Sequence, residues 1–251
     1  MAQYAGGVMD APFPSEIGGY VFAGGRSSRM GRDKALLELA GKPLLRHAVK
    51  KLRRICMDVR VLSANPEFAE YAPIVPDLHP NCGPLGGMEA ALAHSIFDWN
   101  LFMPVDMPFL PSAFINQWLR RTLTDEKRGA RLAMFTVDGV PQPTLAMVHR
   151  DVIPFVTGAM ERGEFKLYPV LEEAGRELAA KQGILFGMAF RTLPWSNQGT
   201  FSATVNLYGQ RQEAWLAITE AQQEAKHLWF ANLNTPEEFA VAERYVAALD
   251  T

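Results

Sequence analysis

The sequence feature that most constrains the fold is an apolar run that breaks into a glycine-rich basic loop, Tyr20–Lys34 (YVFAGGRSSRMGRDK). Glycine permits unusual backbone dihedrals and lets the main chain approach a ligand closely. The glycines and cations of the loop are Gly24, Gly25, Arg26, Arg29, Gly31, Arg32 and Lys34. Backbone N–H groups beside cations suit a polyphosphate, and the end of an apolar strand is where a phosphate loop is expected. A Gly- and Arg-rich surface turn is the structural alternative for this composition.

The loop differs from the common phosphate-binding motifs. A Walker loop needs Gly-Lys followed by Ser or Thr, but Arg32 and Asp33 separate Gly31 from Lys34, and the loop contains no G-x-G-x-x-G. The segment AGGRSSRMGRDKALLELAGKPLL instead resembles the signature loop of nucleotidyltransferases, AGG-x-S-x-RMG-x-x-K, and is most similar to the bacterial molybdenum cofactor guanylyltransferases. The resemblance implies a Rossmann-like nucleotide-binding domain of the nucleotide-diphospho-sugar transferase type.

Composition indicates a folded protein without a global basic surface. Hydrophobic residues make up 48% and charged residues 21% of 251 residues, and the formal net charge is −2, so nucleic acid is not an expected partner. Cys56 and Cys82 lack disulfide or zinc spacing, which favours a reducing cytoplasm, although Cys82 stands in a loop where redox chemistry is conceivable. Signal-peptide and membrane-spanning patterns are absent from the sequence, so we expect no membrane association.

The order of apolar runs predicts a three-layer α/β domain with a mainly parallel sheet. We expect residues 1–18 to form a flexible tail and residues 19–251 to form one domain, with an extra segment at about 181–228 that contains a polar helix at 212–227. After the loop, apolar residues at helical spacing predict a helix from Leu44 to Ile55. Its basic residues, expected on the solvated face, are Arg46, Lys50, Lys51, Arg53 and Arg54.

Polar residues follow two predicted strands. Asn65 follows Val59–Ala64, and Asp77 follows Ile74–Val75. Ligands in open parallel sheets lie beyond the carboxyl ends of strands, where these side chains would meet a base or ribose. Asn and Asp are also common turn residues, so a structural role is an open alternative.

A second glycine-rich turn, Gly83–Met88, opens a predicted helix. The free N–H groups of a helix start could contact a phosphate or sugar. GPLGG at this place also resembles the corresponding segment of the guanylyltransferases.

The apolar run Trp99–Asp106 is predicted as a strand and ends on one carboxylate, Asp106. A Mg²⁺ ion held by one carboxylate takes its other ligands from phosphates and water, so Asp106 is a candidate metal ligand. A turn aspartate before a proline is the structural alternative. PVDMPFLP resembles the metal-binding segment of the same family.

Near the end of the sequence, Trp229–Leu233 is predicted as a strand, followed by a helix that Thr235 caps. ANLNTPEE resembles the family segment NVNTPEE, whose first Asn helps the metal and phosphate site. Asn232 is therefore a possible second metal or phosphate contact, and helix capping alone is the alternative explanation.

The resemblance implies GMP transfer from Mg²⁺-GTP to the terminal phosphate of molybdopterin, with release of pyrophosphate. Lys34 and Arg29 would act on the phosphates, Asp106 would hold Mg²⁺, and Asn65 and Asp77 would contact guanine. The other residues of the implied nucleotide site are Phe22, Ala23, Gly24, Gly25, Gly83, Pro84 and Leu85. Partners for molybdenum insertion or molybdoenzyme maturation are implied as well.

Two alternatives to guanylyl transfer remain. One is a cytidylyl- or other nucleotidyltransferase that acts on molybdopterin or on another phosphorylated acceptor. The other is a nucleotide-binding adaptor without turnover, against which the presence of both Lys34 and Asp106 counts.

Overall fold

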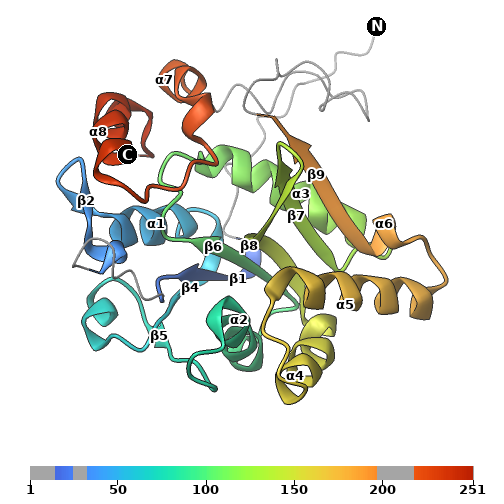
Figure 1. The fold of residues 1–251 in the computed structure, drawn as a ribbon. Helices are drawn as coiled ribbons and strands as arrows, with labels where there is room; N and C mark the ends of the chain where they lie inside the picture. The colour runs from blue at the N-terminus through green and yellow to red at the C-terminus, as the bar shows by residue number, and fades with distance from the viewer. Residues whose placement is uncertain (1–14, 25–32, 197–217, 251) are drawn as a thin grey trace, which may run out of the picture.

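A computed structural model describes residues 15–24, 33–196 and 218–250 (Figure 1). Seven strands form one sheet in the order β5-β4-β1-β6-β8-β7-β9. They are β1 (Ser15–Phe22), β4 (Cys56–Leu62), β5 (Ile74–Val75), β6 (Trp99–Pro104), β7 (Leu132–Val137), β8 (Val140–His149) and β9 (Phe190–Trp195). β8 runs antiparallel to both β6 and β7, whereas the other neighbouring strands pair in parallel, which confirms the mainly parallel α/β sheet. β2 (Glu38–Leu39) and β3 (Lys42–Pro43) form a separate small hairpin.

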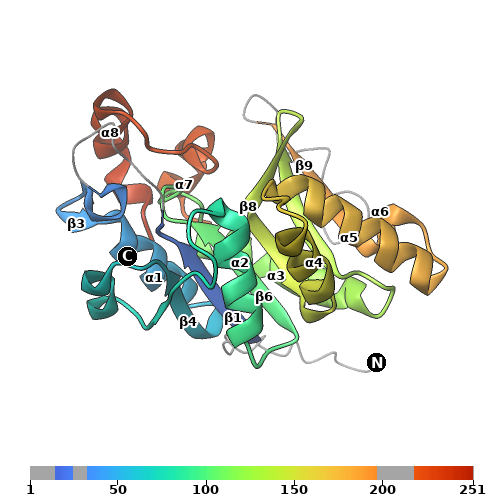
Figure 2. The same ribbon diagram turned by 60° about the horizontal axis from the view of Figure 1, so that its bottom comes forward.

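Helices cover both faces of the sheet, which gives the three layers (Figures 1 and 2). One face carries α2 (Gly83–His94), α4 (Ile153–Glu161) and α5 (Leu167–Gln182). The other face carries α1 (Leu44–Leu52) and α3 (Ser112–Glu126). The shorter helices are α6 (Phe186–Ala189), α7 (Glu220–Glu224) and α8 (Pro236–Ala242), with 3₁₀ turns at Lys34–Leu36, Pro66–Glu70, Arg150–Val152, Lys226–Leu228 and Glu243–Ala248. None of the described helices is long and apolar enough to cross a membrane.

β1 shows how residue alternation builds two cores from one strand. Ile17 and Val21 pack into the core under α1 and α3, whereas Tyr20 and Phe22 join the core under α2 and α4. Tyr20 and Phe22 both stack on Phe102 of β6, with ring centroids 5.4 and 5.6 Å apart. Because successive side chains of a strand point to opposite faces, the central strand is buried on both sides.

The expected boundary of the N-terminal tail is wrong, because β1 already begins at Ser15. Two consecutive glycines such as Gly18-Gly19 are typical of a loop, but here both lie in β1 in the middle of the sheet. A Cβ atom on Gly18 would lie 2.9 Å from Asn100 Oδ1, and one on Gly19 would lie 2.9 Å from Cys56 Sγ. Close packing on both faces therefore requires glycine here. Residues 1–14 lie outside the described part of the chain.

Three further sequence expectations need correction. β9 lies inside the expected extra segment, yet it pairs in parallel with β7 and completes the sheet. Of the polar helix expected at 212–227, the described part holds α7 and a 3₁₀ turn, and residues 212–217 lie outside it. Trp229–Leu233 is a loop rather than a strand, because Trp229 and Phe230 pack in an aromatic cluster with Phe114.

The expectation that the basic residues of α1 all face solvent is wrong for one residue. Lys51 is only 1% exposed, whereas Lys50 and Arg53 are exposed as expected. The apolar stripe itself is buried as predicted, from Leu44 to Leu52.

Candidate functional site

The carboxyl ends of four neighbouring parallel strands, β5, β4, β1 and β6, meet at one edge of the sheet. β1 pairs with β4 on one side and with β6 on the other, so the strand order reverses at β1. Ligands of open α/β sheets bind beyond the carboxyl ends of strands at such a switch point. The predicted phosphate loop leaves β1 at this point, directly after Phe22.

Three polar side chains from distant parts of the sequence meet at this edge. Lys34 Nζ lies 2.5 Å from Asp106 Oδ2 and donates to Asn234 Oδ1 at 2.5 Å. Lys34 begins a 3₁₀ turn that Asp33 caps, because Asp33 Oδ1 accepts the Ala35 N–H at 3.0 Å. The side chains of Lys34 and Asp106 are 16% and 17% exposed, so the ion pair is largely shielded from water. The predicted phosphate-binding lysine and the predicted metal ligand are thus direct neighbours.

Asp106 is held by its backbone and keeps one carboxylate oxygen without a partner. The Leu233 N–H donates to the Asp106 carbonyl at 3.1 Å, and the preceding Val105 N–H donates to the Phe22 carbonyl at 3.2 Å. Asp106 Oδ1 is buried and makes no hydrogen bond with any residue that the structure describes. A buried oxygen of this kind is costly unless something occupies it, so the residue fits the ligation of a cation.

A Mg²⁺ site here would rest on this single carboxylate. Within residues 15–24, 33–196 and 218–250, no group of three or more His, Cys, Asp and Glu side chains is placed to hold a metal ion. Mg²⁺ keeps water and substrate phosphates as ligands and needs only one or two carboxylates, so Asp106 is sufficient.

Asp77 and Phe22 lie at the same edge of the sheet, on the side that faces α2. A Cβ atom on Gly87 would lie 3.3 Å from the Phe22 ring and 3.5 Å from Asp77 Oδ1, and one on Gly86 would lie 3.8 Å from Asp77 Oδ2. The two glycines therefore let the loop after β5 approach the helix closely. Desolvation raises the pKa of Asp77 above its ordinary value.

The predicted contacts at the start of α2 fall into two groups. Gly83 (φ +61°) and Pro84 are exposed at the first turn, and the N-cap residue Cys82 makes no side-chain capping hydrogen bond. Leu85 is fully buried in the core with Tyr20. Leu85 therefore offers no exposed surface to a nucleotide, unlike Gly83 and Pro84.

Asn65 has a structural task at the end of β4. Its Oδ1 accepts the Glu67 N–H at 3.1 Å and caps the 3₁₀ turn Pro66–Glu70. Its own N–H donates to Ser63 Oγ at 3.1 Å. The turn role considered in the sequence is therefore present, and the side-chain amide nitrogen is the group that remains for a base.

Two predicted site residues, Gly25 and Arg29, lie outside the described residues. Ala23 is buried, and its N–H donates to the Leu62 carbonyl at 3.3 Å. Gly24 is exposed at the end of the described strand segment.

Sequence reasoning selected Asn232, but the asparagine that contacts Lys34 is Asn234. Asn232 takes part through its carbonyl, which accepts from Asn234 Nδ2 at 3.2 Å. The signal that identifies Asn234 is the predicted capping box itself. Thr235 and Glu238 make both of its hydrogen bonds, and the carboxylate of Glu238 also accepts the Asn234 N–H.

Comparisons with known proteins identify a family and several relatives. The family described as MobA-like NTP transferase domain matches residues 19–178. A molybdenum cofactor guanylyltransferase of Serratia proteamaculans is 38% identical over 176 residues, which cover 67% of this chain and 85% of that protein. The molybdenum cofactor guanylyltransferase of Vibrio cholerae is 30% identical over 166 residues, covering 64% of this chain and 79% of that protein.

Solved structures share the fold at lower identity. Molybdopterin-guanine dinucleotide biosynthesis protein A from Archaeoglobus fulgidus superposes with a TM-score of 0.63 at 21% identity, over 92% of this chain and 100% of that one. A nucleotidyl transferase from Methanothermobacter gives a TM-score of 0.59 at 14% identity, over 93% and 99% of the two chains. The family resemblance read from the glycine-rich loop is thereby confirmed, and this chain belongs to the MobA-like NTP transferase family.

Proposed function

We propose that this nucleotidyltransferase transfers GMP from GTP to the terminal phosphate of molybdopterin and releases pyrophosphate. The printed names of the relatives from Serratia and Vibrio support this substrate pair. The observation that carries the proposal is the convergence of Lys34, Asp106 and Asn234 at the switch point of the sheet.

The reaction exchanges one phosphoanhydride linkage for another. An oxygen of the molybdopterin phosphate forms a bond to the α-phosphorus of GTP, and the bond from that phosphorus to the bridging oxygen of the β-phosphate breaks. Because the substrate supplies the nucleophile, the protein contributes positioning and charge neutralisation.

Lys34 and Asp106 divide these tasks. In the ligand-free protein Lys34 neutralises Asp106, and an incoming triphosphate offers the ammonium group a second anion. Asp106 is the residue that would hold Mg²⁺, which neutralises phosphate charge when it is bound. Asn234 Oδ1 accepts a hydrogen bond from Lys34 and would hold its ammonium group between Asp106 and the phosphates. Arg29 and the amides of Gly24 and Gly25 would complete the phosphate site.

The base would lie on the other wall, beside Phe22 and Asp77. A carboxylate can accept the N1–H and N2–H of guanine, and Asn65 can contribute its side-chain amide. Ala23, Gly83 and Pro84 would border the nucleotide. The stacked rings of Phe22 and Phe102 give this wall a rigid aromatic support.

We further place the enzyme in the cytoplasm, where molybdenum insertion or molybdoenzyme maturation proteins would be its partners and nucleic acid would not be. Both cysteines, Cys56 and Cys82, are free and buried, which supports a reducing compartment.

Calorimetric titration with each Mg²⁺-NTP, followed by pyrophosphate release with molybdopterin, tests the proposal. GTP should bind more tightly than the other nucleotides and should support release. Preference for CTP would favour the cytidylyl alternative, and nucleotide binding without release would favour an adaptor.

A further inference from the structure

Lys51 is a buried cation in the core, on a helix whose other lysine at the C-terminal turn, Lys50, is exposed. Its ammonium group donates to the Pro108 carbonyl at 2.8 Å and to the Leu110 carbonyl, and it lies 3.4 Å from Asp250 Oδ2. A fully buried ammonium is costly unless its three donors are used. Here the partners come from two segments remote in sequence, so the lysine connects them.

The two carbonyls belong to the loop that carries Asp106. Residues 105–111 connect β6 to α3, and no strand pairs with them among the described residues. At the near end of this loop, Val105 and Asp106 are fixed by backbone hydrogen bonds to Phe22 and Leu233. At the far end, Lys51 supplies the donors that the carbonyls need.

Asp250 holds the same far end of the loop, where α3 begins. Its Oδ2 accepts the Ser112 N–H at 2.9 Å, at the start of α3, and its Oδ1 accepts from Gln222 Nε2 at 3.1 Å. The Asp250 side chain is only 9% exposed. The carboxylate thus joins α1, α3 and α7 around the loop, and its charge compensates that of Lys51.

We propose that Lys51 and Asp250 are positioning residues that fix the place of Asp106 by holding the far end of loop 105–111. This inference rests on the proposed role of Asp106 as the metal ligand. Neither residue touches substrate. Their effect reaches the reaction through the loop, because only Met107 separates Asp106 from the first carbonyl that Lys51 holds.

The test replaces Lys51 by Met (Lys51→Met) and uses Lys50→Met as the matched control, which removes the same charge from the exposed side of the same helix. In the ligand-free protein, amide hydrogen exchange of residues 105–110 should become faster in Lys51→Met and stay unchanged in the control. Mn²⁺ serves as the metal probe in the presence of GTP. Its affinity should fall about tenfold, and kcat should fall about 10- to 100-fold, since a small displacement of a catalytic group has effects of this size. KM for the acceptor should not change.

Asp250→Asn provides a second arm if Lys51→Met does not fold. The amide keeps an acceptor for the Ser112 N–H but removes the charge beside Lys51, so a smaller change of the same kind is expected in exchange and Mn²⁺ affinity. Equal exchange and equal Mn²⁺ affinity in the variants and the Lys50→Met control would overturn the inference. If the unmodified protein itself binds no Mn²⁺ and GTP, the proposed function fails, whereas the exchange measurement still decides whether Lys51 holds the loop.

Discussion

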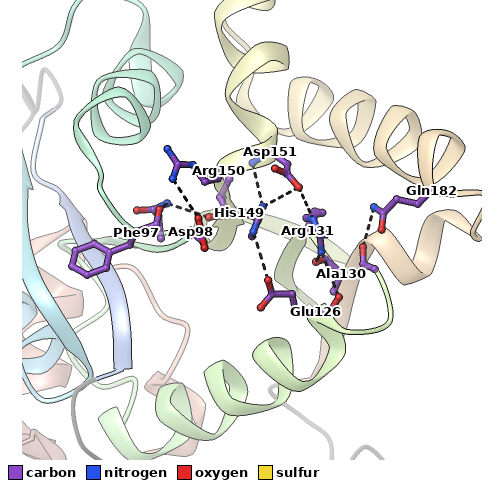
Figure 3. A network of polar contacts seen from close by, with 12 residues as sticks. Phe97, Asp98, Glu126, Ala130, Arg131, His149, Arg150, Asp151 and Gln182 are labelled. Carbon is purple, nitrogen blue, oxygen red and sulfur yellow. Dashed lines mark hydrogen bonds and ion pairs between the residues drawn. The ribbon is translucent and has the colours of Figure 1, made fainter.

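Two polar clusters lie at opposite ends of β6, and they differ in how completely the chain satisfies them. At the amino end, His149 stands opposite Trp99 in the sheet, and its Nδ1 accepts the Asp151 N–H at 3.2 Å (Figure 3). Arg131 donates to Asp151 at 2.7 Å, and Glu126 lies 3.7 Å from His149 Nε2.

At the carboxyl end, Lys34 donates to one oxygen of Asp106 and to Asn234 Oδ1, and the other Asp106 oxygen has no partner among the described residues. The ionisable groups of the first cluster pair with one another, as expected of groups that stabilise the fold, although the buried Nε1 of the neighbouring Trp99 has no partner among the described residues. The second keeps an unpartnered acceptor at the switch point, as expected of a site that a ligand completes. Substitutions in the two clusters should therefore separate activity from stability.

The largest effect on activity is expected for Asp106→Asn. The amide keeps the size of the side chain but removes the charge that would hold Mg²⁺, so pyrophosphate release should fall by about 10³-fold. The melting temperature should stay close to that of the unmodified protein, because the amide oxygen can still accept from Lys34 Nζ. Turnover within about threefold of the unmodified protein would exclude the metal role of Asp106.

Lys34→Ala should have the next largest effect. Loss of the ammonium group removes charge neutralisation from the phosphates, and turnover should fall by about 10²-fold with the fold intact. Lys42→Ala, at an exposed position of β3, is the matched control and should retain full activity. Equal activity of the two variants would contradict the assignment of Lys34.

At the other end of β6, His149→Asn should change stability and leave turnover unaltered. Asn retains an acceptor for the Asp151 N–H but loses the edge contact with Trp99, whose ring centroid lies 5.2 Å away. The free energy of unfolding at pH 8 should therefore fall by about 1 kcal/mol. A loss of turnover in this variant with unchanged stability would remove the distinction between the two clusters.

The same histidine makes stability depend on pH. Burial lowers the pKa of His149, against the opposing influence of the carboxylates of Asp151, Glu126 and Asp98. Because the folded protein resists protonation, the unfolded chain binds more protons once the pH falls below about 6.5. The contribution of neutral His149 to the free energy of unfolding is complete above that pH, and it is lost as the pH falls through the lower pKa of the folded protein. Thermal melting between pH 8 and pH 5 should show a smaller decline for His149→Asn than for the unmodified protein.

Local patterns predicted much of the fold and part of the site. Apolar runs that end on polar residues identified β4, β5 and β6 and placed Asp106 correctly beyond a strand. Lys51 was assigned to the solvated face because helical spacing cannot show that loop 105–111 and Asp250 cover that side of α1.

The sequence indicates Asn232 because it matches the first Asn of the family segment NVNTPEE at the end of a predicted strand, whereas Trp229–Leu233 is a loop that packs against Phe114 and Asn234 is the residue beside Lys34. In both cases the deciding contact joins segments more than 50 residues apart. Such contacts are invisible to local periodicity.

The smallest effect is expected for Asn65→Asp, which tests a residue with features of both clusters. Asn65 lies at the carboxyl edge, yet its Oδ1 is already used to cap a turn. Aspartate preserves that cap, so the free energy of unfolding should change by less than about 0.5 kcal/mol. It replaces the amide donor by an acceptor, however. If that donor contacts guanine, KM for GTP should rise about fivefold to tenfold, the equivalent of one hydrogen bond. An unchanged KM would leave Asn65 with its structural task alone and would assign recognition of the base to the wall formed by Asp77 and Phe22.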